Sequence, residues 1–158
     1  MPGEFDATPD DIDAFVKKVV GWSQLLQRCA DAALVRAHEQ YVDGDIGYAD
    51  YSDALQQKLA VIKSCVDMTN AAGSVLADVA ENQLSPVEEA SRKLTEAADK
   101  LVDLENGVTV VTELVVAAAA LSSALALPSV ASIAAAGSAI YHVADQIAAD
   151  AKGAGDAP

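Results

Sequence analysis

The character of this chain changes near Gly107. Up to Glu105 the sequence is acidic, rich in charge and patterned with a helical period, whereas residues 108–140 are almost wholly apolar and Glu113 is their only charged residue. A chain of 158 residues is long enough to bury one substantial core. Because a long apolar segment is not stable against water, this one must be covered by the rest of the chain, by a partner or by a membrane.

The composition favours closely packed helices and excludes some classes of partner. Alanine dominates the apolar residues and aromatic residues make up only 4% of the chain, which is typical of helix packing and not of a sheet core. The net charge of −14 and the pI near 4.2 argue against nucleic acid as a partner and against electrostatic adsorption to anionic lipid. The acidic amino terminus has neither a basic region nor an apolar run, so we expect no secretory signal peptide.

Two long amphipathic helices are predicted over residues 8–83, joined by a turn at residues 43–47. Thr8-Pro9-Asp10-Asp11 is a helix start signal, and Asp43-Gly44-Asp45-Ile46-Gly47 ends the first helix. The apolar stripe of the first helix is Ile12, Phe15, Val16, Val19, Trp22, Leu26, Cys29, Ala33, Ala37 and Tyr41. The stripe of the second helix is Tyr48, Tyr51, Leu55, Leu59, Ile62, Val66, Thr69, Ala72, Leu76 and Val79. Its spacings of three and four predict the seam of a coiled-coil-like hairpin.

A third amphipathic helix is predicted over residues 85–106, beginning at the capping-box pattern Ser85-Pro86-Val87-Glu88. Val108 and Val111 continue its apolar stripe across Gly107. After it, residues 108–149 are predicted to form an apolar helical hairpin.

Pro128-Ser129 turns the chain within that hairpin, and residues 150–158 are expected to be a disordered tail. The predicted fold is therefore all-α, with residues 1–158 forming a single domain. Its architecture is an elongated up-down bundle of four or five helices with an apolar C-terminal helical hairpin.

The apolar hairpin is the first candidate functional region. Residues 108–127 are just long enough to span a bilayer, but Ala and Ser contribute little to insertion and Glu113 is costly there. Three placements stay open: a buried central helix, a membrane-insertable hairpin, or a surface covered by a partner. The residues that would carry membrane or partner contact are Val108, Val111, Leu114, Val115, Leu121, Leu125, Ile133 and Ile140. We expect the hairpin to stay inside the bundle in the resting form.

No pattern in the sequence predicts catalysis, a metal or a cofactor, so we expect that the protein is not an enzyme. His38 lacks the second His of a zinc-protease helix, and His142 with Asp145 has no nucleophile to activate. Residues 39–50 fit an EF-hand calcium loop in part, but Tyr41 occupies a position that needs a carboxylate. A solvated acidic turn is the better interpretation of those residues.

The two cysteines, Cys29 and Cys65, lie at similar distances on either side of the predicted turn. Antiparallel helices would bring them to nearly the same level, where a disulfide is feasible if the side chains between the helices are small. The alternative is two buried free thiols that act as small apolar side chains. A disulfide would imply an oxidising compartment and hence export.

The first half of the chain, over residues 8–83, resembles the small helical hairpins exported by bacterial type VII secretion. Tyr41-Val-Asp43-Gly44 stands where that family has Trp-x-Gly, with a different aromatic residue and one extra position. Tyr141-His-Val-Ala-Asp145 matches the family's Tyr-x-x-x-Asp/Glu export signal in its letters. The resemblance implies a bacterial protein, secreted without a cleavable signal peptide or retained in the cytoplasm, that associates with a second helical protein.

The second half is similar, more distantly, to alpha-helical pore-forming toxins, which store an apolar helical hairpin against long helices. Val108–Leu127 and Val130–Ile147 would form such a hairpin, and this similarity implies release of the hairpin at a membrane. Together these patterns predict a non-enzymatic interaction protein that works by helix-face association. Its partner would be another helical protein, a second copy of itself or membrane lipid, and not nucleic acid; the alternative is a pore-forming or membrane-inserting component.

Overall fold

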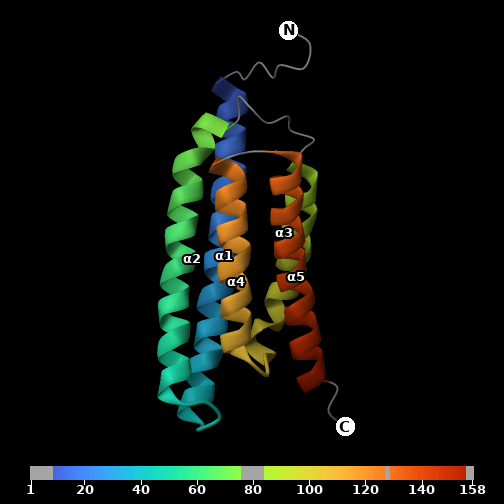
Figure 1. Cartoon of the computed structure of the whole chain (residues 1–158). Helices are drawn as coiled ribbons and strands as arrows, with labels where there is room; N and C mark the ends of the chain where they lie inside the picture. Colours follow the sequence, from blue (N-terminus) through green and yellow to red (C-terminus); the bar gives the residue numbers. More distant parts are fainter. Residues whose placement is uncertain (1–8, 76–83, 127–128, 156–158) are drawn as a thin grey trace.

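The computed structural model describes residues 9–75, 84–126 and 129–155, and these residues form five α-helices and a short 3-10 helix. The elements are α1 (Pro9–Val42), α2 (Tyr48–Val75), α3 (Ser85–Ala97), the 3-10 helix η2 (Ala98–Asp103), α4 (Gly107–Ala126) and α5 (Val130–Gly155). The helices run alternately up and down and pack along their lengths (Figure 1). The predicted all-α up-down bundle is confirmed.

Helix α4 occupies the centre of this arrangement. It packs against α1, α2 and α5, while α3 packs mainly against α5 and also contacts α1, where Lys18 pairs with Glu88 at 2.8 Å. In Figure 1 the pair α1 and α2 therefore lies on one side of α4, and the pair α3 and α5 lies on the other. One continuous apolar core joins all five helices.

The apolar stripe predicted for the first helix is the buried face of α1, with one exception at its end. Side chains from Phe15 to Ala37 along this stripe are buried, apart from the half-buried Val16. At the last turn Gln40 is buried and the predicted Tyr41 is more than one third exposed. Beyond Val42, Gly44 adopts a φ of +84°, which glycine tolerates better than other residues and which lets the chain reverse into α2.

The prediction that the apolar stripe of the second helix packs inside the hairpin is wrong. The buried positions of α2 are Ala54, Val61, Cys65 and Met68. Most of the large predicted residues are instead exposed, including Leu59 at 64% and Val66 at 52%. The reason is that α2 packs against both α1 and α4, and the side chains that face these two helices are offset by one or more positions from the large residues of the stripe. Leu76 and Val79 lie outside the described residues.

The third predicted helix, over residues 85–106, is shorter than expected. Helix α3 ends at Ala97, the 3-10 helix follows, and Leu104 is extended with a ψ of 136°. The chain then reverses at Gly107 to begin α4, so Val108 does not continue the stripe of α3 in one helix. The reversal is possible because side chains of α1 bind the backbone carbonyls that the interrupted helix leaves unpaired.

The predicted tail over residues 150–158 is also partly wrong, since α5 continues to Gly155. Two contacts hold its last turns against the bundle. The Asp150 carboxylate accepts a hydrogen bond of 2.9 Å from the backbone N–H of Asn106, and Ala151 is buried. Residues 156–158 lie outside the described residues.

Candidate functional site

The apolar residues predicted to contact a membrane or partner lie mainly in the core of the bundle. Six of the eight are at most 2% exposed: Val111, Leu114, Leu121, Leu125, Ile133 and Ile140. Val108 and Val115 are half-buried. Within the described residues, α4 alone has the length and composition of a membrane-crossing helix, a property that it shares with the central helices of ordinary bundles. The structure thus uses this hairpin as its core.

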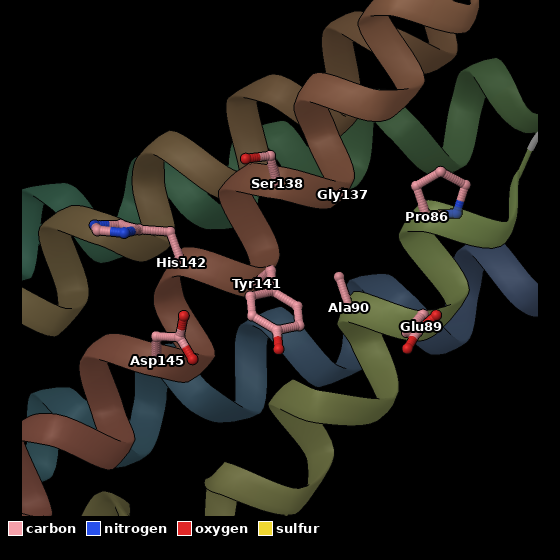
Figure 2. Close-up of a pocket in the computed structure, with 8 residues that line it drawn as sticks. All are labelled: Pro86, Glu89, Ala90, Gly137, Ser138, Tyr141, His142 and Asp145. Atoms are coloured by element: carbon pink, nitrogen blue, oxygen red, sulfur yellow. The ribbon is translucent and has the colours of Figure 1, made fainter.

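Tyr141 and Asp145, which match the export signal of type VII secretion in letters, lie one turn apart on the exposed side of α5. They border a shallow recess of about 420 Å³ between α3 and α5 (Figure 2). Pro86 and Gly137 close one end of this recess, where a Cβ on Gly137 would lie 2.8 Å from the backbone of Pro86. The recess is open and its two carboxylates, from Glu89 and Asp145, belong to different helices.

His142 does not form a pair with Asp145 in the structure. Its Nε2 lies 3.3 Å from the carboxylate of Glu113 on α4, and the imidazole side chain is 61% exposed. In Figure 2 its ring points away from Tyr141 and Asp145. Glu113, which would be costly in a membrane, is therefore accommodated at the surface between α4 and α5.

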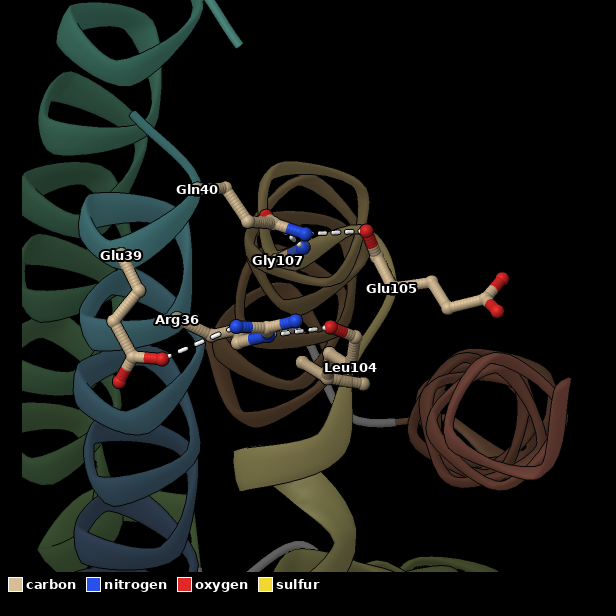
Figure 3. Close-up of polar contacts among 6 residues, drawn as sticks. All are labelled: Arg36, Glu39, Gln40, Leu104, Glu105 and Gly107. Carbon is tan, nitrogen blue, oxygen red and sulfur yellow. Dashed lines mark hydrogen bonds and ion pairs between the residues drawn. The ribbon is translucent and has the colours of Figure 1, made fainter. Parts of the chain in front are cut away.

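The reversal at Gly107 is the polar anchor that fixes α4 to α1 (Figure 3). Arg36 donates from Nε to the carbonyl of Leu104 at 2.6 Å, and Gln40 donates from Nε2 to the carbonyl of Glu105. The same Gln40 side chain accepts the backbone N–H of Gly107 at 3.1 Å. A Cβ on Gly107 would lie 2.6 Å from the carbonyl oxygen of Ala33, so only glycine permits this close approach. These roles of Arg36 and Gln40 were not predicted from the sequence, in which the only signal is the polar Gln40 beside the apolar stripe.

Of the two alternatives for Cys29 and Cys65, the disulfide is contradicted, because both residues are buried free thiols. The ion pair between Asp31 and Lys58 (2.6 Å) and the ring contact between His38 and Tyr51 fix the register of the hairpin. In this register Cys65 lies level with Ser23, to whose carbonyl its thiol donates at 3.6 Å. Cys29 is therefore offset from Cys65 by about five residues, or ~7.5 Å along the helix axis.

Burial affects the acidity of both thiols. It raises the pKa of Cys29 to about 12, against a smaller opposing effect of the Arg28 guanidinium. It also raises the pKa of Cys65, against smaller opposing effects of hydrogen bonds with Ser23 and Gln27. Both thiols are thus neutral at physiological pH, which suits apolar packing and not nucleophilic chemistry.

The turn between α1 and α2 is a tight acidic turn. Backbone hydrogen bonds from Gly44 to Tyr41 and from Asp45 to Gln40 close it. Among the residues that the structure describes, no group of three His, Cys, Asp or Glu side chains is placed to hold a metal ion.

Three tyrosines gather beside this turn. Tyr41 stacks on Tyr51 with ring centroids 5.3 Å apart, and it meets Tyr48 edge to face at 6.0 Å. Their association ties the end of α1 to the start of α2.

An apolar face runs along the outside of α1 and α2, and we call it the open face. On α2 it consists of six large residues of the predicted seam, those from Tyr48 to Val66. On α1 it consists of two valines seven residues apart. These residues are Val35, Val42, Tyr48, Tyr51, Leu55, Leu59, Ile62 and Val66. Tyr51 and Ile62 are half-buried, and the other six are exposed.

The residues of the open face share one side of the hairpin. Val35 and Val42 alternate with Asp31 and His38 along one side of α1. Asp31 and His38 contact Lys58 and Tyr51 of α2. On α2 the residues of the open face are one or two positions from the buried residues in sequence. They lie on the opposite side of the helix from Gln57, which accepts a hydrogen bond from Thr112 of α4. A regular apolar stripe of this kind can accept the apolar stripe of another helix.

Comparisons of this chain with protein-family models, with curated proteins and with solved structures find no match.

Proposed function

We propose that this protein is a non-enzymatic helical-bundle interaction protein that binds another helical chain through the open face. The observation that carries the proposal is the coiled-coil-like stripe of α2, from Tyr48 to Val66, which no element in the described part of the chain covers. Contiguous exposed apolar surface with helical spacing is typical of a site for helix association.

The burial of the α4–α5 hairpin supports the same proposal. The core includes large side chains from all five α-helices, so the open face is not needed to complete the fold. Leu55, Leu59 and Val66 could be polar without loss of internal packing, yet they keep the three-four spacing of a seam. A seam outside the core is explained by a partner outside the bundle.

The resemblance to the hairpins of type VII secretion fits this proposal, because it lies in the same two helices. Association of hairpins is what that resemblance implies. The Tyr141 and Asp145 side chains are exposed on α5, so an export receptor could reach them while the open face is occupied. Export by such a route, from a bacterial cytoplasm, is the corresponding proposal for localisation.

The proposal is tested by photo-crosslinking in cells. A photoreactive amino acid at Leu59, on the open face, should give an adduct with a helical chain. The control position is Val116 on α4, which is similarly exposed at 55% but lies off the face and should give none. The captured chain, once purified, should form a stoichiometric complex with this protein by light scattering. Absence of an adduct at Leu59, or equal adducts at both positions, would overturn the proposal.

A second candidate function is membrane insertion by the α4–α5 hairpin, favoured by the length and composition of α4. Insertion requires the polar anchor at Gly107 to break and the six buried residues of the hairpin to leave the core. Flotation with neutral and anionic liposomes, together with release of an enclosed dye, tests it. If the helix-association proposal is correct, the protein stays unbound and the dye stays enclosed.

A further inference from the structure

We infer that the open face pairs with the open face of a second copy of this chain, in antiparallel orientation. This inference rests on the proposed function and names the partner. Its basis is an uneven distribution of charge along the α1–α2 hairpin, combined with the position of the apolar residues between the two charged regions.

The turn end of the hairpin is purely acidic. Residues 37–57 include Glu39, Asp43, Asp45, Asp50 and Asp53, and they include no Lys or Arg. The middle of the two helices, residues 14–36 and 58–66, has the opposite balance, with six Lys or Arg residues against Asp31 alone, and acids return beyond this middle part as Asp10, Asp11, Asp13 and Asp67. The hairpin therefore has an acidic end and a basic shaft within a chain whose net charge is −14.

This polarity distinguishes the two ways in which two copies can meet. A parallel pair would place two acidic ends side by side, where like charges repel. An antiparallel pair places the acidic end of each copy beside the basic shaft of the other. The antiparallel pair is also the arrangement in which a two-fold axis perpendicular to the hairpin repeats every contact, so a single face suffices for both copies.

The apolar residues fit the same symmetry. With the axis between Leu55 and Leu59, Leu55 of one copy lies level with Leu59 of the other, and Tyr48 lies level with Val66. In this register the acidic turn at Asp43 lies level with Lys17 of the second copy, which is exposed on α1. Lys63, beside Val66 on the exposed side of α2, lies level with the start of the second copy's α2, next to its acidic turn. The apolar centre thus supplies attraction, and the charged ends specify the direction.

The charge pattern also argues against the other occupants. A bilayer of anionic lipid would meet the acidic turn with like charge. A helix of another protein would need matching apolar spacing and a matching charge gradient, and a second copy of this hairpin already has both. Both alternatives give distinct results in the experiments below.

Sedimentation equilibrium of the full chain tests the pairing, and Val66→Asp is the informative variant. Val66 and Val116 have nearly equal exposure, 52% and 55%, so Val116→Asp is a matched control with the same chemical change. We expect a dimer for the parent chain and for Val116→Asp. For Val66→Asp we expect a dissociation constant at least about tenfold higher, because an aspartate in the contact is desolvated without a partner charge.

The orientation is tested by reversing charge at the turn. Asp43→Lys with Asp45→Lys makes the chain four units less negative, which by itself reduces repulsion between copies. In the antiparallel pair it also opposes the basic shaft, so we expect dimerisation to weaken by about three- to tenfold. Adding Lys17→Glu and Lys63→Glu should restore it. Stronger dimerisation of the Asp43→Lys, Asp45→Lys chain would overturn the antiparallel orientation.

The failure of this inference is distinguishable from failure of the proposed function. A monomeric parent chain whose Leu59 position crosslinks to a different protein overturns self-pairing and leaves helix association standing. A monomeric chain with no adduct at Leu59 overturns both. A monomer that binds anionic liposomes, and loses binding on Val66→Asp, overturns both in favour of a lipid surface.

Discussion

The α4–α5 hairpin and the α1–α2 hairpin present opposite relations between sequence and exposure. The first is almost uncharged and buries its large side chains at the centre of the bundle. The second is amphipathic and highly charged, and it keeps a row of large apolar residues in contact with solvent. The more apolar hairpin is the structural core, and the more polar one presents the open face.

This difference shows that total apolar content and apolar pattern carry different information. A helix that is apolar on all sides is favoured in a core with neighbours on several sides, as α4 has in α1, α2 and α5. A regular stripe on an otherwise polar helix identifies a contact without saying which chain supplies the other half. We therefore expect changes in the α4–α5 hairpin to affect the free energy of unfolding, and changes on the open face of the α1–α2 hairpin to affect association.

The largest expected effect is the loss of folding when a charge enters the core hairpin. Leu114→Asp removes a fully buried side chain of α4 and buries a carboxylate without a partner, so we expect a loss of about 4 kcal/mol or more in the free energy of unfolding. Urea unfolding followed by circular dichroism measures it. The control Val116→Asp, on the exposed side of the same helix, should cost less than about 1 kcal/mol. Equal losses would show that α4 is not the core.

The next largest effect concerns the close approach of α4 to α1. Gly107→Ala places a methyl group 2.6 Å from the carbonyl oxygen of Ala33 and 2.9 Å from the backbone nitrogen of Ala37, and we expect a loss of about 1–3 kcal/mol because backbone must move. Gly21→Ala is the control, since nothing lies within 4 Å of the position that its methyl group would take on the exposed side of α1. That change should be neutral or stabilise by up to about 1 kcal/mol, because alanine favours helix. Thermal unfolding of both variants measures the two effects. A larger loss of stability for Gly21→Ala than for Gly107→Ala would contradict the close approach of α4 to α1.

The sequence predicts the helices better than it predicts which of their faces are buried. The starts of α1, α2 and α3 at Pro9, Tyr48 and Ser85 follow from local signals of proline, glycine and capping residues. The ends of α3 and α5 are set by distant contacts, of Arg36 and Gln40 with residues 104–107 and of Asp150 with Asn106. Local pattern cannot contain these contacts, since their partners lie more than forty residues away.

The error on α2 has a different cause. The large residues Leu55, Leu59 and Val66 dominate the periodicity, whereas the side chains of α2 that are buried in the bundle are Ala54, Val61, Cys65 and Met68. Periodicity identifies an apolar stripe, but the side of a helix that is buried depends on where its neighbouring helices lie. The register of the hairpin explains the error on the cysteines, because the pairs Asp31–Lys58 and His38–Tyr51 place Cys29 level with about residue 60, five residues before Cys65. The sequence therefore predicts the apolar stripe itself, but this stripe lies on the outside of the hairpin and not between α1 and α2.

A smaller effect is expected from the anchor at the base of α4. Gln40→Leu leaves the N–H of the buried Gly107 and the carbonyl of Glu105 without their side-chain partner, and we expect a loss of about 2 kcal/mol. The control is Gln57→Leu on α2, whose hydrogen bonds with Asp53 and Thr112 are exposed to water and should contribute less than about 0.5 kcal/mol. Chemical unfolding of the two variants in parallel compares a buried with an exposed amide. A loss for Gln57→Leu as large as that for Gln40→Leu would contradict the anchor.

Alkaline pH should weaken the bundle gradually through its buried thiols. The pKa of Cys29 is raised from 9.0 to about 12 in the folded chain, so the unfolded chain loses this proton first as pH rises. Stability from the neutral thiol is complete below about pH 9 and declines between pH 9 and 12, by up to ~1.4 kcal/mol for each pH unit. Cys29→Ala should lower this slope relative to the parent chain in urea unfolding at a series of pH values. An unchanged slope would show that the thiol is not protected by burial.

The smallest effect on the folded chain itself is expected at the open face, and it should depend on concentration. Leu59→Asn replaces a side chain that is 64% exposed, so the free energy of unfolding of the isolated monomer should change by less than about 0.5 kcal/mol. Because association stabilises only the folded chain, the Tm of the parent protein should rise with protein concentration. The Tm of Leu59→Asn should not rise, and that of a Val116→Asn control should follow the parent. Differential scanning calorimetry over a concentration series measures all three. A parent Tm independent of concentration would show that the open face adds nothing to stability through self-association, whereas a shared dependence in all three chains would place the contact on another surface.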